Sequence, residues 1–382
     1  MKRNVESMAF FLPTEIIDMI IQFSPPEVTP SILRTSSMAY ALGCKALYRY
    51  VTYSLTAKQY IQLLKTLTTS TSGRPSYLPH PTTFVRALHL DFTSNLVTAN
   101  LLRLIHRALL AVPLLQDLQL EFSLLDSRFP LGWMLANFTS PLEVLTTSLR
   151  CDASLARFLE SQPLIRDLHL RGYQLSNSAE AFNLSPDALP RLSNVLVVHA
   201  GAPVLRTVVS GRPVMHAGVT LFREDVDEPC LSALDALICG TCPLRRLTLL
   251  TLDDTTRPDE IIQAVAVRMP ELEALHVVVL LASYTLGNLF AATAYLKQMR
   301  HLKYLTFMAG EPSEGEDPTP HTLENERRVV GAWGDACPTL RSVILPKGQL
   351  WYEQQGKWRS GALAEKAEEP IPGTPGTLEI PV

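Results

Sequence analysis

Leu115-Gln116-Asp117-Leu118-Gln119-Leu120 has the form Leu-x-x-Leu-x-Leu, and its alternation at Leu118 and Leu120 is the pattern of a β-strand that is buried on one face. Closely related segments recur along the chain. They are Ala87–Leu90, Leu142–Leu145, Ile165–Leu170, Leu192–Val197, Val219–Leu221, Leu244–Leu249, Leu272–Val277, Leu302–Phe307 and Leu340–Leu345. Residues 83–359 are therefore predicted to form a repeat of short strands.

The spacing of these segments indicates the kind of repeat. The distance from one central apolar residue to the next is between 23 and 30 residues, except for a last step of 38. A leucine-rich repeat has a period of about 20–29 residues and consists of a strand followed by a helix or an irregular return. The asparagine that usually follows the strand is largely missing. The pattern therefore resembles a degenerate leucine-rich repeat.

Helical spacing occurs in most of the returns between the predicted strands. It is present in residues 100–111, 154–160, 231–240, 258–269, 286–299 and 323–333, and one short helix is expected within 200–213. Parallel strands need a long crossover, which such helices provide. We predict an α/β fold in which an irregular solenoid has parallel strands inside and helices outside. The alternative is a doubly wound sheet with helices on both faces, although no glycine-rich phosphate turn follows any strand.

Three segments around the repeat are assigned from their composition. Residues 56–82 are rich in Thr, Ser and turn formers, and are predicted to be a linker or surface loop. Trp351 and Trp358 are predicted to cover the open end of the last repeat. Residues 360–382 contain several Pro, Gly and Glu residues and are expected to be a disordered tail.

A different pattern precedes the repeat, in Phe11-Leu12-Pro13-Thr14-Glu15-Ile16-Ile17-Asp18-Met19-Ile20-Ile21. Leu12, Ile16, Met19 and Ile20 fall on one face of a predicted helix, and Ile17 and Ile21 form a second apolar edge. Pro13 suits the first helical position, and Glu15 suits the positive end of the helix dipole. Residues 28–33 and 36–50 also show helical spacing. We therefore expect residues 8–55 to form a small helical domain that binds a partner through the edge it does not bury.

These residues resemble the F-box. Leu12-Pro13-x-Glu15-Ile16-Ile17-x-x-Ile20 is similar to its opening, and Leu33–Val51 is similar to its second half in large fungal families of the basidiomycete type. The resemblance implies that the domain docks on the Skp-type adaptor, and through it on the cullin, of an SCF-type ubiquitin ligase. The residues implied to contact the adaptor are Leu12, Pro13, Glu15, Ile16, Ile20, Leu33 and Leu42. The chain would then be a non-catalytic subunit that recruits a target protein to the ligase.

The predicted strands also suggest where a target would bind. Side chains alternate along a strand, so the polar residues between the core leucines point to the opposite face of the sheet. In a repeat protein this face is a common binding surface. The candidate target-binding residues are His89, Gln119, His169, Thr248, His276 and Thr306, and Asp117, Asp167 and Arg246 are expected to flank them.

Composition limits the partners and the location. Of 382 residues, 47% are hydrophobic and 19% are charged, with a net charge of −3, so neither nucleic acid nor an anionic membrane surface is an expected partner. No apolar run reaches the roughly 20 residues of a membrane span, and Met1–Phe11 lacks the apolar core of a signal peptide. Six cysteines without regular spacing indicate free thiols. We expect a cytoplasmic or nuclear protein.

Motifs for catalysis are missing from the sequence. It contains neither Gly-x-Ser-x-Gly nor His-Glu-x-x-His, and no phosphate loop. Cys239-Gly240-Thr241-Cys242 has the spacing of a zinc-ligand pair, with Cys230 nearby, but a second close pair is lacking. We therefore expect no enzyme, no cofactor and no metal.

Two other functions stay open at this point. The chain could be an interaction scaffold whose F-box-like segment only caps the repeats, an alternative favoured by Ser36–Tyr40, which lacks the basic residue that the family often has there. An enzyme of compact α/β fold is the other. It would need clustered ionisable residues at the carboxyl ends of the strands.

Overall fold

The computed structural model describes residues 12–25, 28–52, 55–69, 80–94, 97–172, 182–199, 201–221, 231–252, 257–310, 322–346 and 348–361. The chain divides into two compact units, 1–192 and 193–382. The sequence instead suggested a boundary near residue 55 and a single repeat domain. The N-terminal helices belong to the same unit as the first strands. The predicted tail lies almost entirely outside the described residues.

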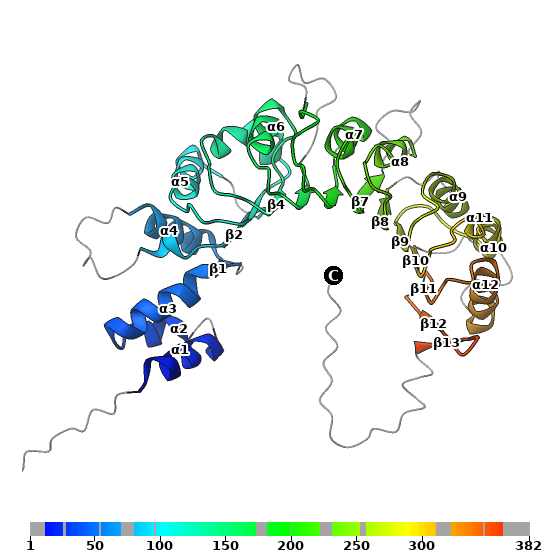
Figure 1. Ribbon diagram of the computed structural model, residues 1–382, viewed down its shortest axis with the longest axis horizontal. Coiled ribbons are helices and arrows are strands. Elements are labelled where there is room, and N and C mark those ends of the chain that lie inside the picture. Colours follow the sequence, from blue (N-terminus) through cyan, green and yellow to red (C-terminus); the bar gives the residue numbers. More distant parts are fainter. Residues whose placement is uncertain are drawn as a thin grey trace, which may run out of the picture. The chain divides into compact units, whose positions relative to one another are not determined.

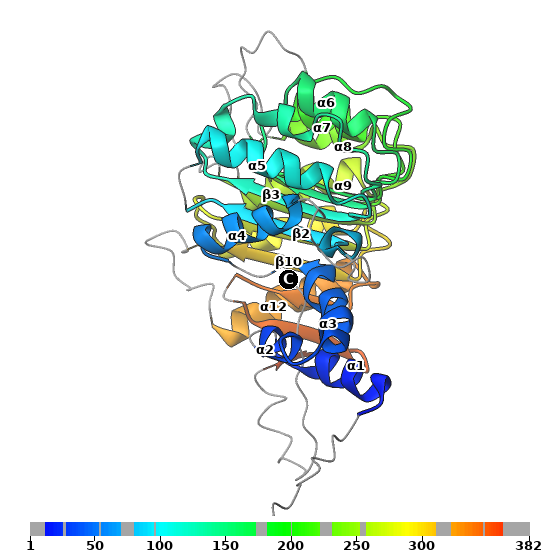
Figure 2. The same cartoon turned by 90° about the vertical axis from the view of Figure 1, so that its left-hand side faces the viewer.

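Three helices open the first unit, as the sequence predicted: α1 (Thr14–Phe23), α2 (Thr29–Leu33) and α3 (Ser37–Arg49). Pro13 was predicted at the first helical position, but it is the N-cap, one residue earlier. Its carbonyl accepts hydrogen bonds from the N–H groups of Ile16 and Ile17 at 3.0 and 3.1 Å. Pro30 lies in the first turn of α2, where a missing N–H costs nothing. Both α1 and α2 pack on α3 (Figure 2).

The strands of the first unit follow in sequence order and are all parallel. They are β1 (Tyr50–Val51), β2 (Ala87–Phe92), β3 (Asp117–Phe122), β4 (Val144–Thr147) and β5 (Asp167–Leu170). The segments between them hold α4 (Ala57–Thr68), η1 (Pro81–Thr83), α5 (Ala99–Leu110), η2 (Asp126–Arg128), η3 (Leu131–Leu135) and α6 (Ala153–Glu160). Each of the four strands predicted here is confirmed, and β1 is an addition.

The predicted linker at 56–82 is wrong for residues 57–68, which form α4. The Thr56 hydroxyl accepts a hydrogen bond from the N–H of Gln59 at 3.4 Å, and the Gln59 side chain accepts from the N–H of Thr56 at 2.9 Å. This is a capping box, which starts a helix by satisfying two otherwise unpaired N–H groups. Tyr60, Leu64 and Leu67 are buried, so α4 serves as the helical return between β1 and β2.

The second unit repeats the arrangement. Its strands are β6 (Asn194–Val197), β7 (His216–Leu221), β8 (Arg246–Thr251), β9 (Ala274–Val279), β10 (Tyr304–Ala309), β11 (Ser342–Ile344), β12 (Leu350–Gln354) and β13 (Lys357–Ser360). Its helices are α7 (Ala202–Val209), α8 (Ser232–Leu237), α9 (Pro258–Arg268), α10 (Leu286–Ala291), α11 (Thr293–Leu296) and α12 (Leu323–Ala336). Strands β6 to β11 pair in parallel, each with the next. The predicted strands and helical returns are therefore confirmed.

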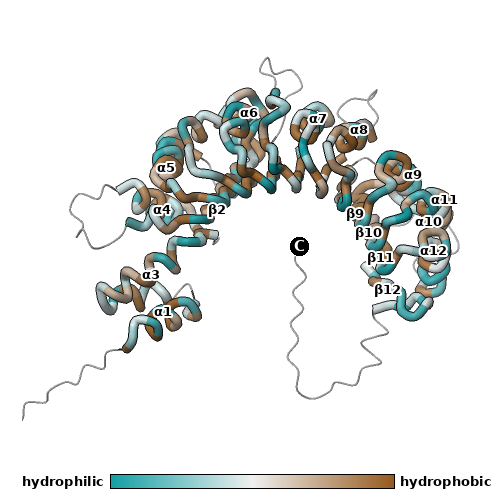
Figure 3. The backbone as a smooth tube through the Cα atoms, in the orientation of Figure 1, coloured by the Kyte–Doolittle hydropathy of each residue, from teal (hydrophilic) through white to brown (hydrophobic). Residues whose placement is uncertain are grey.

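In each unit the helices lie on one side of the strands (Figure 1), which rules out the doubly wound alternative for the described elements. The core lies between the two layers, and Figure 3 shows the hydrophobic residues along strands and helices. Leu88, Leu118, Leu145 and Leu168 occupy one register position in neighbouring strands and are fully buried. The repeated leucines therefore stack into a continuous column, which is why the spacing of the repeat can vary without disturbing the sheet.

An antiparallel hairpin closes the second unit. Strand β12 pairs with β11, and β13 pairs with β12. The indole N–H of Trp351 donates to a carboxylate oxygen of Glu326 on α12 at 3.1 Å, and the Trp358 indole lies against Gly334 of the same helix. Both tryptophans therefore join the end of the sheet to α12, as the sequence predicted for a cap.

Candidate functional site

The first candidate surface is the α1 apolar face, which consists of Leu12, Ile16, Met19, Ile20 and Phe23. These five side chains are 40% to 81% exposed. On the opposite side of the same helix, Ile21 is buried against α3. Exposed apolar side chains that gather on one helix face are typical of a surface that another molecule covers.

Most residues predicted to contact the adaptor lie on the outside of the helical domain. Leu12, Pro13, Glu15, Ile16 and Ile20 are all exposed, and Leu42 is half-buried in α3. The prediction of a partner contact is wrong for Leu33, which is only 7% exposed. Its side chain contacts the backbone of α3 at Gly43, so it holds the domain together instead.

The second candidate surface is the strand face of the first unit. His89, Gln119, Thr146 and His169 occupy one register position on β2 to β5, between the buried leucines. The sequence named three of these four residues. The prediction that they share one side of the sheet is confirmed.

Polar side chains on this face form hydrogen bonds and ion pairs with one another. A ring nitrogen of His89 lies 3.2 Å from a carboxylate oxygen of Asp117, and Gln119 donates to Glu121 at 2.7 Å. Glu121 also accepts from Arg171 at 2.8 Å. Burial and the nearby Arg171 lower the pKa of His169, which lies 3.2 Å from the Thr146 hydroxyl. The acidic residues on this face outnumber the basic ones, because Asp91, Asp117, Glu121 and Asp167 stand on the strands themselves.

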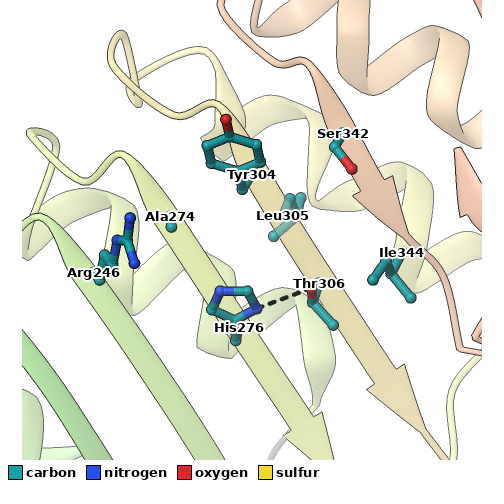
Figure 4. A pocket seen from close by; sticks show the side chains of 8 residues that line it. All are labelled: Arg246, Ala274, His276, Tyr304, Leu305, Thr306, Ser342 and Ile344. Carbon is teal, nitrogen blue, oxygen red and sulfur yellow. Dashed lines mark hydrogen bonds between the residues drawn. The ribbon is translucent and has the colours of Figure 1, made fainter. Parts of the chain in front are cut away.

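The third candidate surface is the strand face of the second unit. Thr248, His276 and Thr306 occupy one register position on β8, β9 and β10, as predicted. His276 Nδ1 and the Thr306 hydroxyl oxygen are 2.9 Å apart, and burial followed by the positive charge of Arg246 lowers the pKa of His276. An open pocket of about 280 Å³ lies here, lined by Arg246, Ala274, His276, Tyr304, Leu305, Thr306, Ser342 and Ile344 (Figure 4).

Some members of both strand faces were not predicted from the sequence. Thr146 and Glu121 lie one residue beyond the ends of the predicted strands. Tyr304 and Ser342 lie inside predicted strands, but two residues before the register position that was named. The same alternation, continued over the full strand, would have found them. Arg171 follows β5, and its ion pair with Glu121 joins residues 50 positions apart, which no local pattern signals.

The described ranges contain neither a candidate metal centre nor a helix suited to a membrane. There, no three or more His, Cys, Asp or Glu side chains gather in a way that could hold a metal ion. Cys239 is exposed and Cys242 is half-buried, both as free thiols, and Cys230 lies outside the described residues. No helix in this part of the chain has both the length and the apolar character needed to span a membrane.

Comparison with known proteins leaves the chain without a match, because no family model and no curated protein sequence is similar enough. The resemblance to the F-box and to leucine-rich repeats therefore stays a prediction that rests on the residues quoted above.

Proposed function

We propose that this protein is a non-catalytic, substrate-recruiting subunit of an SCF-type cullin-RING ubiquitin ligase. In this proposal the F-box-like helices bind a Skp-type adaptor, and through it a cullin. The strand faces bind a target protein. The observation that carries the proposal is the α1 apolar face, which stays exposed although the opposite edge of the same helix is buried.

The physical case for a partner rests on that asymmetry. A helix in a small bundle gains stability by burying one edge, and α1 does so with Ile21. The five apolar residues on its other face keep 40% to 81% of their surface exposed in the isolated chain. Full burial of an exposed apolar side chain contributes about 1.5–3 kcal/mol, and a partner would supply the share that is still exposed. A groove that accepts an amphipathic helix is one of the recurring ways in which proteins bind each other.

A pull-down with a purified Skp-type adaptor tests this proposal. Changing Leu12 and Pro13 to Ala should abolish binding, at a cost of about 2 kcal/mol or more if they are hot spots of the interface. Gln22→Ala is the matched control, since Gln22 is exposed on the same helix outside the apolar face. If the intact protein does not bind the adaptor, the ligase assignment is wrong.

A scaffold without ligase function is the second candidate, and β1 favours it. Tyr50 and Val51 end the F-box-like segment and pair with Ala87 and Leu88 of the repeat, and the N–H of Arg86 donates to the carbonyl of Arg49 at 2.9 Å. The helices are therefore continuous with the sheet and could serve as its cap. This reading is supported if removal of residues 1–55 unfolds the rest of the first unit while the intact chain never binds the adaptor.

The proposed location is the cytoplasm or nucleus, where ubiquitin ligases of this type act and where thiols stay reduced. Cys44, Cys151 and Cys337 are buried free thiols. Burial, with the nearby Asp152, raises the pKa of Cys151 to about 12, so this thiol is protonated and unreactive at neutral pH.

A further inference from the structure

A small residue lies between two long side chains in the pocket of the second unit. In the ladder of paired strands, Arg246, Ala274, Tyr304 and Ser342 stand side by side on β8 to β11. Ala274 separates two long side chains whose strands are two spacings, or about 10 Å, apart. Ala274 is buried and lines the pocket between Arg246 and Tyr304, and Figure 4 shows both of them projecting from the same side of the sheet as His276.

The charge around this pocket is positive. Three cations precede strands next to the pocket, and each is paired with a carboxylate. Glu273 accepts hydrogen bonds from Arg245 at 3.3 Å and from Lys303 at 2.9 Å. Glu353 accepts one from Arg341 at 3.4 Å. Arg246 is exposed, and within the described residues no carboxylate lies within ion-pair distance of it. Glu273, which precedes the neighbouring strand β9, is already held by Arg245 and Lys303.

Among the described residues of this unit, the strand face carries no acidic side chain. This face is formed by three rows of side chains across β6 to β11, and the residues of each row share one register position. The first row contains Arg246, the second contains Thr248, and the third contains Thr220, Leu250, Val278 and Met308. None of the described residues in these rows is Asp or Glu. The corresponding face of the first unit is acidic, so the cationic pocket is a specific property of the second unit.

An apolar strip lies beside the pocket. Leu250, Val278 and Met308 are partly or largely exposed on neighbouring strands, and Leu280 and Leu281 follow β9 with exposed fractions of 51% and 63%. Leu250 is four residues from Arg246 along β8, which corresponds to about 13 Å. The surface therefore presents a cation and an apolar strip at a fixed separation.

We propose that this strand face binds an extended acidic peptide. A carboxylate side chain of the peptide enters the pocket and accepts hydrogen bonds from the Arg246 guanidinium, and an apolar side chain four positions away covers the strip of Leu250, Val278 and Met308. Tyr304, Thr306 and Ser342 supply hydroxyl groups to the polar part of the same segment. The inference rests on the proposal that the strand faces hold the target, but it does not require adaptor binding by α1.

Fluorescence anisotropy with the full chain tests it. The probe is a labelled peptide of about twelve residues, with Glu and Leu four positions apart in a Gly/Ser background, a spacing that matches about 13 Å of extended chain. Arg246→Gln should weaken binding about tenfold or more, the range expected for a hydrogen bond to a charged group. Ala274→Leu should do the same by filling the pocket. Arg300→Gln is the matched control, because Arg300 is exposed in the return before β10.

Further peptides separate the two parts of the site. Replacing Glu by Gln should reduce binding as much as Arg246→Gln does, and added salt should weaken only the Glu peptide, because salt screens exposed charges. Changing the spacing from four to two should also weaken binding. Melting temperatures of the variants establish that each one is folded.

Two outcomes would overturn the proposal: no peptide of the panel binds, or Arg300→Gln weakens binding as much as Arg246→Gln does. Adaptor binding by the same preparation is measured in parallel. If the peptide binds but the adaptor does not, the ligase function fails and the peptide site stands. The reverse result removes the peptide site and leaves the ligase function intact.

Discussion

The Cδ1 atom of Ile21 lies 3.5 Å from the position that a Cβ atom would take at Gly43, so α1 rests directly on the backbone of α3. Leu33 of α2 comes even closer to the same point. A single glycine therefore allows both short helices to approach the long one. Without this approach the domain would have no core, since α1 and α2 are too short to be stable alone.

Replacing Gly43 by Ala should destabilise the helical domain by about 1–3 kcal/mol, because the added methyl group overpacks the contact with Leu33. Urea unfolding followed by circular dichroism measures the loss. Gly331→Ala in α12 is the control, because nothing lies within 4 Å of the added Cβ there. It should be neutral or stabilise the protein by about 0.5–1 kcal/mol, as alanine does in a helix interior. Equal effects of both changes would contradict the packing described here.

Ile16 and Ile21 should respond in opposite ways to the same substitution. Ile16→Asp places a charge on an exposed position, so it should leave the melting temperature nearly unchanged while it reduces adaptor binding by about 2 kcal/mol or more. Ile21→Asp buries an unpaired carboxylate and should unfold the helical domain. Calorimetric titration with the adaptor and thermal melting of both variants provide the comparison. If Ile16→Asp binds normally, the α1 apolar face is not the adaptor site.

Acid should destabilise the second unit through His276. The pKa of this residue is lowered from its ordinary value of 6.5 by burial and by Arg246, so the unfolded chain takes up a proton at a higher pH than the folded chain does. Stability is therefore greatest above pH 6.5 and falls as the pH drops through the folded-state pKa. Urea midpoints measured between about pH 7.5 and pH 5.5 should decrease, and His276→Asn should make the decrease smaller. Part of the slope will persist in the variant, because burial also lowers the pKa of His199, which belongs to the same unit.

Replacing the Trp351 indole should destabilise the β12–β13 hairpin that ends the second unit. Trp351→Phe keeps most of the apolar contact but removes the 3.1 Å hydrogen bond to Glu326, whose carboxylate is buried. The expected cost is about 1–3 kcal/mol, the range for removing one partner of a buried polar group. Tyr352→Phe on the same strand is the control and should have little effect. An unchanged urea midpoint for Trp351→Phe would show that the hairpin does not depend on this bond.

The alternation of apolar residues predicted the strands well, because each strand carries its own signal. Leu118 and Leu120 are buried and Gln119 is not, as the period of two requires. The missed helix α4 also had a local signal, the Thr56–Gln59 capping box, which was hidden by the turn-forming residues that follow it. Strand β1 had no such signal, because two residues are too few to show a period.

The sequence by itself determined the local elements, namely the strands, most of the returns and the two apolar edges of α1, since each follows from a repeat in hydropathy over a few residues. Only the tertiary structure decided that Leu33 is internal, that Glu121 pairs with Arg171, and that Arg246, Ala274 and Tyr304 line one pocket. These features depend on which residues become neighbours across strands or helices. That choice is made by packing between segments far apart in the chain, and no pattern within one segment encodes it.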